Sequence, residues 1–187
     1  MASIIDIENC EPERSDKYFV DTNVWYWFSS SSPTELETRP YQIEKYPFFI
    51  EKALDNGAKI FHSSFTFLEL SHIIEKEQCK RLYGNEWFAK IKEFRDDPGK
   101  RELTLREIKT SWDTIRNVSA CLNFPAQENF PEKIHEHLSN ASLDPYDACY
   151  YEIMNKNSIV QIISDDRDFS NIANIELFTA NSRVLGR

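Results

Sequence analysis

The chain contains 187 residues, of which 41% are hydrophobic and 13% aromatic, and its formal net charge is −9. This is enough apolar material for one core, and we expect a single domain over residues 1–187. No apolar run approaches the roughly 18 residues of a membrane helix, and the segment 1–16 is polar and acidic, unlike a signal peptide. The sequence therefore predicts a cytoplasmic protein without a membrane span. Its four cysteines lie far apart with no C-x-x-C spacing, which argues against a zinc site or a disulfide framework.

The predicted elements alternate between short β-rich runs and helical patterns. In chain order they are a strand at 17–20, helices at 24–28 and 47–55, a strand at 59–62, a helix from residue 63, a helical block over about 75–140, a helix from 145 to about 155, and strands at 158–163 and 175–179. This alternation predicts a mainly parallel sheet covered by helices on both faces. We expect an α/β core over about 17–180, with residues 75–140 as a helical insertion.

The first predicted strand ends in three oxygen-bearing side chains, Asp21, Thr22 and Asn23. Ligands of open α/β sheets bind outside the carboxyl ends of the strands, and a carboxylate, a hydroxyl and an amide suit a hard cation. The same triplet also forms ordinary Asx turns at strand ends. Taken alone, the triplet leaves both interpretations open.

The strand at 59–62 leads into Ser63, which is a typical start of a helix. The helix that follows carries Leu68, Glu69 and His72 at spacings of three and four residues. This spacing places them along one side and predicts that Glu69 lies beside an apolar stripe. A residue at the edge of such a stripe can equally be an exposed surface acid.

The carboxyl-terminal part adds two further groups of acids. Asp144 followed by Pro145 predicts an N-cap and a first helical residue, which places Asp147 in the first turn of a helix. There, Asp147 could simply complement the helix dipole. The strand at 158–163 is followed by Asp165 and Asp166; we interpret Asp165 as a solvated turn residue.

Four acids thus follow strands or begin helices: Asp21, Glu69, Asp147 and Asp166. In a parallel sheet these places lie at one edge. Four carboxylates would repel one another unless a cation neutralised them, and Mg²⁺ or Mn²⁺ held by carboxylates and water is the usual solution. Such an ion can lower the pKa of a water molecule and stabilise charge on a phosphoryl oxygen. The pattern therefore predicts a divalent-metal site.

Four segments resemble, in the same order, the acidic motifs of PIN domains. They are Val20-Asp21-Thr22-Asn23-Val24, the helix start at Ser63-Ser64 with Glu69, Tyr146-Asp147-Ala148, and Ile163-Ser164-Asp165-Asp166-Arg167-Asp168-Phe169. The resemblance implies a three-layer fold and an Mg²⁺- or Mn²⁺-dependent endoribonuclease. The best-known branch of the family contains toxins of bacterial toxin-antitoxin pairs, so an antitoxin protein is an implied partner.

The resemblance also implies roles for particular residues. Asp21, Glu69, Asp147 and Asp166 correspond to metal ligands or water-positioning acids. The supporting residues are Asn23, Ser164 and Asp168.

The positive charge is concentrated in the helical block. From Lys76 to Arg116 there are 11 lysines and arginines against 8 acids, whereas the rest of the chain holds 11 against 23. One interpretation is an RNA-binding surface that includes Lys100, Arg101 and Arg106; the other is a solvated helical face of mixed charge. The many aromatic residues further suggest a homodimer.

Three functions are compatible with these features. The complete acid set favours the metal-dependent ribonuclease over a non-catalytic PIN-like module that binds RNA or protein. A phosphatase of the haloacid-dehalogenase type also has an aspartate after its first strand, but it needs a second acid at the position of Asn23. No glycine follows the first strand, which argues against a dinucleotide or P-loop site.

Overall fold

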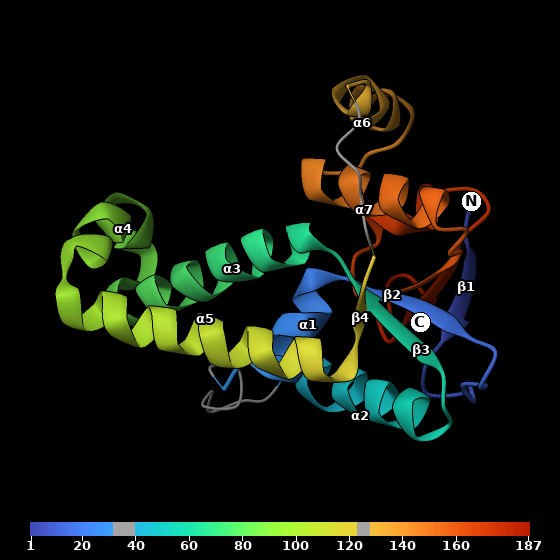
Figure 1. The fold of residues 1–187 in the computed structure, drawn as a ribbon, viewed down its shortest axis with the longest axis horizontal. Coiled ribbons are helices and arrows are strands. Elements are labelled where there is room, and N and C mark those ends of the chain that lie inside the picture. Colours follow the sequence, from blue (N-terminus) through green and yellow to red (C-terminus); the bar gives the residue numbers. More distant parts are fainter. Residues whose placement is uncertain (32–39, 123–127) are drawn as a thin grey trace.

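Six parallel strands form a single sheet in the computed structural model, which describes residues 1–31, 40–122 and 128–187 (Figure 1). The order across the sheet is β1-β6-β5-β2-β3-β4. The strands are β1 (Ser3–Asp6), β2 (Lys17–Val20), β3 (Lys59–His62), β4 (Ala120–Cys121), β5 (Gln161–Ile163) and β6 (Glu176–Thr179). Because every pairing is parallel, all carboxyl ends lie at one edge of the sheet.

Helices cover both faces of this sheet, which gives three layers (Figure 1). The α-helices are α1 (Thr22–Ser29), α2 (Gln42–Asp55), α3 (Ser64–Tyr83), α4 (Trp87–Asp96), α5 (Pro98–Val118), α6 (Phe130–Asn140) and α7 (Pro145–Lys156). The described residues also form the short 3₁₀ helices η2 (Gly84–Glu86) and η3 (Asp168–Asn171). The structure confirms the predicted α/β class and the mainly parallel sheet. No helix of the described residues is long and apolar enough to cross a membrane.

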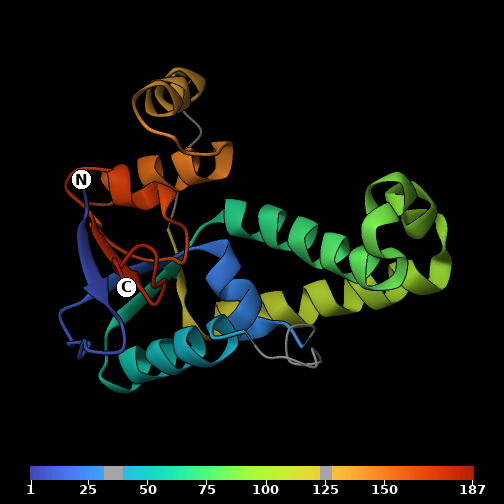
Figure 2. The same ribbon diagram turned by 180° about the vertical axis from the view of Figure 1, so that it is seen from behind.

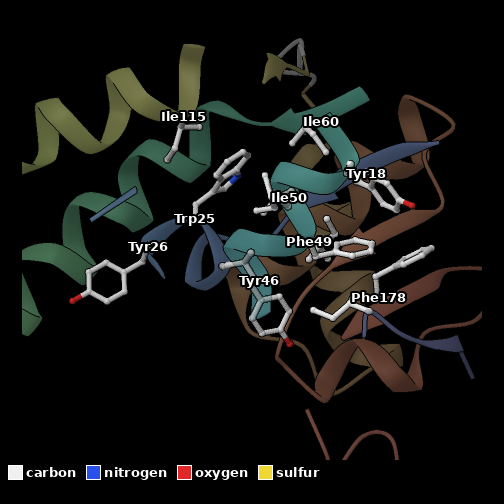
Figure 3. Close-up of a cluster of buried hydrophobic side chains, with 14 of the residues drawn as sticks. Tyr18, Trp25, Tyr26, Tyr46, Phe49, Ile50, Ile60, Ile115 and Phe178 are labelled. Carbon is white, nitrogen blue, oxygen red and sulfur yellow. The ribbon is translucent and has the colours of Figure 1, made fainter. Parts of the chain in front are cut away.

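The two faces of the sheet are covered by different helices because successive strand residues point to opposite sides. Tyr18 and Val20 of β2 pack into a cluster with residues of α1, α2, α3 and α5. Phe19, between them, packs on the opposite face with residues of α7. Figure 3 shows the first cluster, in which Phe49 lies close to the rings of Tyr18 and Phe178. Burial of such side chains is the main stabilisation of the fold.

Strand β2 lies in the middle of the sheet, between β3 and β5. Val20 is opposite Ile163, so the residues that follow them, Asp21 and Ser164, leave the sheet side by side. This register brings the first and last acidic segments together although they are far apart in sequence.

Helices α3, α4 and α5 form an arm that extends away from the sheet (Figures 1 and 2). The start of α3 and the end of α5 lie near the sheet, and α4 lies at the far end of the arm. The predicted helical block is therefore correct for α4, α5 and the end of α3. It is wrong at β4, which follows α5 and joins the sheet beside β3. Helix α6 lies on the outer side of α7 (Figure 1).

Several predicted boundaries differ from the structure for local reasons. Strand β1 was not predicted, because its short apolar run is surrounded by acidic residues. It pairs with β6, so the sheet begins well before residue 17. Strand β4 was also not predicted, because its two residues are too few to show the alternation of buried and exposed side chains that marks a strand. Helix α2 starts before the proline that seemed to begin it, and Pro47 lies inside the helix. Strand β5 begins at Gln161, three residues later than predicted.

Candidate active site

Asp21 and the end of β5 form a chain of hydrogen bonds at the carboxyl edge of the sheet. The Ser164 hydroxyl donates to Asp21 Oδ2 at 2.8 Å and accepts from the Asp166 amide at 2.9 Å. The Asp166 carboxylate in turn accepts from the Asp168 amide at 2.8 Å. The tight turn after β5 thus fixes Asp166 close to Asp21, as the sequence predicted for these two acids.

The Asp21 side chain is almost completely buried, with 2% of its surface exposed. It occupies the N-cap position of α1 but makes no capping hydrogen bond of normal geometry, although the Asn23 amide lies near enough to lower its pKa. Burial, followed by the charges of Glu69 and Asp166, outweighs the Ser164 hydrogen bond and raises the pKa of Asp21 to about 7. An Asx turn alone does not explain a carboxylate in such a costly position.

Helix α7 brings Asp147 to the same place. The Asp144 carboxylate caps the helix by accepting from the Tyr146 and Asp147 amides at 2.8 and 2.9 Å, which confirms its predicted N-cap role. Asp147 is 7% exposed, so it does more than face solvent near a helix dipole. Burial, followed by the charges of Asp21 and Asp144, raises its pKa to about 9.

Glu69 enters from α3, which begins directly after β3. Ser63 and Thr66 form a capping box at its start. Glu69 is half-buried, and its Oε2 accepts a hydrogen bond of 2.6 Å from the Tyr150 hydroxyl. Burial raises the pKa of Glu69. Hydrogen bonds from Tyr150 and Thr22 lower it, but burial has the larger effect.

The predicted apolar stripe beside Glu69 was wrong in detail. Leu68 is 54% exposed and His72 is also exposed, whereas Leu70 and Ile74 are completely buried. The start of α3 is apolar on several sides, so spacing alone could not identify which side packs on α1 and α5.

We call Asp21, Glu69, Asp147 and Asp166 the acidic rim. These carboxyls influence one another electrostatically, and none of the main influences on Asp21 or Asp147 is a lysine or arginine. Among the described residues, no three histidine, cysteine, aspartate or glutamate side chains converge as a ready-made metal cluster. The acidic rim is therefore a set of neighbouring carboxylates with little compensating charge, rather than a closed cage.

Two of the remaining predicted positions are also placed by the structure. Asn23 lies half-buried in the first turn of α1. Asp165, expected to be a solvated turn residue, is instead half-buried and accepts hydrogen bonds from Tyr41 and Tyr46, both 2.7 Å, and from Gln42 at 3.1 Å. The sequence could not show these bonds, because the partners are Tyr41, directly before α2, and two residues of α2. All three lie more than 115 positions before Asp165 in the chain. Asp165 holds the turn from which Asp166 projects.

The three basic residues that were predicted to bind RNA are each paired with a nearby acid. Lys100 lies 3.0 Å from Asp97, Arg101 3.5 Å from Glu75, and Arg106 2.9 Å from Glu102. Lys100 and Arg101 also lie near the start of α5, at the end of the arm away from the strand ends (Figures 1 and 2). An RNA phosphate would have to compete with these carboxylates.

Comparison with known proteins places the chain in a family. A family model of the PIN domain matches residues 18–175. Among solved structures, the crystal structure of PAE2754 from Pyrobaculum aerophilum is similar, with a TM-score of 0.48 and 16% identity over 92% of this chain and 96% of that chain. The comparison with curated proteins gave no match. Since the PIN model covers most of the chain, including all four acidic segments, the chain belongs to the PIN-domain family, a superfamily of the nuclease type.

Proposed function

We propose that this protein is an Mg²⁺- or Mn²⁺-dependent endoribonuclease. The observation that supports the proposal most strongly is the pair Asp21 and Asp147: both are buried, both have raised pKa values, and the charge of Asp21 is one cause of the raised pKa of Asp147. A fold that buries two such carboxylates side by side gains most when a divalent ion binds them.

The residues present fit a hard divalent cation. The acidic rim offers only oxygen donors, which Mg²⁺ and Mn²⁺ prefer, and Mg²⁺ keeps several waters, so that one or two direct carboxylates suffice. Asp21, Asp147 and Asp166 would hold the ion, with Glu69 beside them. When bound, the ion would make a water more acidic and stabilise negative charge on the phosphoryl group.

The chain's own residues contribute orientation and shielding. Ser164 donates to Asp21 and fixes the direction of its carboxylate. The amide of Asp168 does the same for Asp166. Because Asp21 and Asp147 are shielded from bulk water, their carboxylates would hold a cation strongly once it has displaced their protons.

Cleavage of a labelled single-stranded RNA would test the proposal. The parent should cut within the strand when Mn²⁺ or Mg²⁺ is present and should stop when EDTA is added. Asp21→Asn, Glu69→Gln and Asp166→Asn should each lower the rate at least about a hundredfold, since each removes a preorganised charge. Asp144→Asn is the matched control, because asparagine caps helices as well as aspartate does.

The outcomes separate the competing functions. Metal-dependent cleavage that survives in all three rim variants would indicate a contaminating nuclease and overturn the proposal. RNA binding without cleavage by the parent would instead support the non-catalytic module. A toxin role is an additional part of the proposal; it predicts that expression of the parent, but not of Asp21→Asn, arrests bacterial growth and that an antitoxin protein relieves the arrest.

A further inference from the structure

A buried phenol connects three of the four acidic segments. Tyr150 lies one turn after Asp147 on α7 and is completely buried. Its hydroxyl donates to Glu69 Oε2 at 2.6 Å, and it lies 2.6 Å from the hydroxyl of Thr22, the residue after Asp21. No feature of the sequence marked Tyr150, because its partners lie 81 and 128 positions away.

We propose that Tyr150 is a positioning residue that fixes the Glu69 carboxylate within the acidic rim; this inference rests on the proposed function. A glutamate on a helix has three rotatable side-chain bonds, and a half-buried carboxylate without a donor would adopt several positions. The phenol has one proton, and donating it to Glu69 selects one of these positions. Burial raises the pKa of Tyr150, so the phenol stays protonated and keeps this donor.

The packing of the ring does not require the hydroxyl. The Tyr150 ring lies against Phe19, with the ring centroids 5.1 Å apart, and belongs to the apolar cluster under α7. A phenylalanine would fill the same volume. A buried hydroxyl beside a carboxylate is costly unless it is bonded, so its presence here is explained by the bond to Glu69. Since no part of Tyr150 is exposed, it cannot contact RNA directly.

The variant Tyr150→Phe tests this role, with Tyr151→Phe as the matched control on the same helix. Tyr151 packs its ring against His137 on the side facing α6. Tyr150→Phe should lower kcat and weaken Mn²⁺ binding by about tenfold each, the loss expected for a hydrogen bond to a charged group. KM for RNA should change by less than about twofold, because the residue makes no substrate contact. Tyr151→Phe should change neither.

A double-mutant cycle distinguishes positioning from a general structural effect. In a Glu69→Ala background, Tyr150→Phe should cause no further loss of kcat or of Mn²⁺ affinity, because the group it positions is gone. An equal loss in both backgrounds would overturn the proposal. If Tyr150→Phe lowers the melting temperature below the assay temperature, the same cycle is measured by Mn²⁺ titration at a lower temperature, at which the variant is folded.

The Mn²⁺ titration also separates this inference from the proposed function. If the parent binds Mn²⁺ but cuts no RNA, the nuclease proposal fails while the titration still tests Tyr150. If the parent cuts RNA and Tyr150→Phe matches its kcat and Mn²⁺ affinity, the role of Tyr150 fails and the nuclease proposal stands.

Discussion

Replacing Asp147 by asparagine should stabilise the metal-free protein. The ordinary pKa of an aspartate is 3.8, and in the folded chain that of Asp147 is raised to about 9. Above pH 4 the unfolded chain releases this proton while the folded chain retains it, so the stability falls as the pH rises, until the pH passes the folded pKa. Asparagine is neutral in both states and removes this penalty.

The size of the effect follows from the same pKa values. At pH 7 the ordinary pKa lies about three units below the pH, and each unit corresponds to about 1.4 kcal/mol, so about 4 kcal/mol is an upper bound. Part of the penalty is shared with Asp21, which is raised to about 7 by the same burial and repulsion. We expect Asp147→Asn to raise the free energy of unfolding by about 2–4 kcal/mol at pH 7.

Urea denaturation in EDTA at pH 4, 7 and 8.5 measures this directly. The difference between Asp147→Asn and the parent should be close to zero at pH 4 and largest at pH 8.5. Asp144→Asn, three residues earlier, keeps the cap and removes only one of the charges that raise the pKa of Asp147, so its effect on stability should be clearly smaller than that of Asp147→Asn. Excess Mn²⁺ should stabilise the parent more than the variant. A variant that is less stable than the parent at pH 7, or a difference that does not depend on pH, would show that the Asp147 carboxyl does not destabilise the metal-free protein.

Three further predictions concern other parts of the structure. Burial lowers the pKa of His62 to about 4, so the free energy of unfolding should fall as the pH drops from 6.5 to 4. In urea denaturation, this fall should be smaller by roughly 2–3 kcal/mol in His62→Gln than in the parent. Replacing both Lys100 and Arg101 by alanine should change the slope of log affinity for RNA against log salt concentration by less than about 0.7, the value for one phosphate contact, because both cations are paired. A change near 1.4 in filter binding would show that both residues contact RNA phosphates. Asp165→Ala should destabilise the protein by about 1–3 kcal/mol in thermal unfolding, because buried Tyr46 loses an acceptor; unchanged stability would contradict this.

The sequence predicted features whose cause is local. Asp144 with Pro145 marked a helix start because capping chemistry involves neighbours three residues apart. The strand at 59–62 was predicted with its correct ends because a turn precedes it and a helix start follows. The approach of Asp21 to Asp166 also followed, since parallel strands end at one edge.

Features that depend on distant contacts could not be predicted. Asp165 was taken for a turn residue because Tyr41 and Tyr46 precede it by 124 and 119 positions. Tyr150 was missed for the same reason. The pairing of Arg101 with Glu75 depends on how α5 crosses α3, which composition does not specify.

A crystal grown with Mn²⁺ and measured for anomalous scattering would show directly whether the acidic rim holds a metal ion. We expect an anomalous peak at the acidic rim, in contact with the Asp21 carboxylate and with a carboxylate of Asp147 or Asp166. The same crystal form of Asp21→Asn should show a weaker peak or none. A parent crystal without a peak at the rim, or with its only peak away from Asp21, would show that the acidic rim is not the metal site.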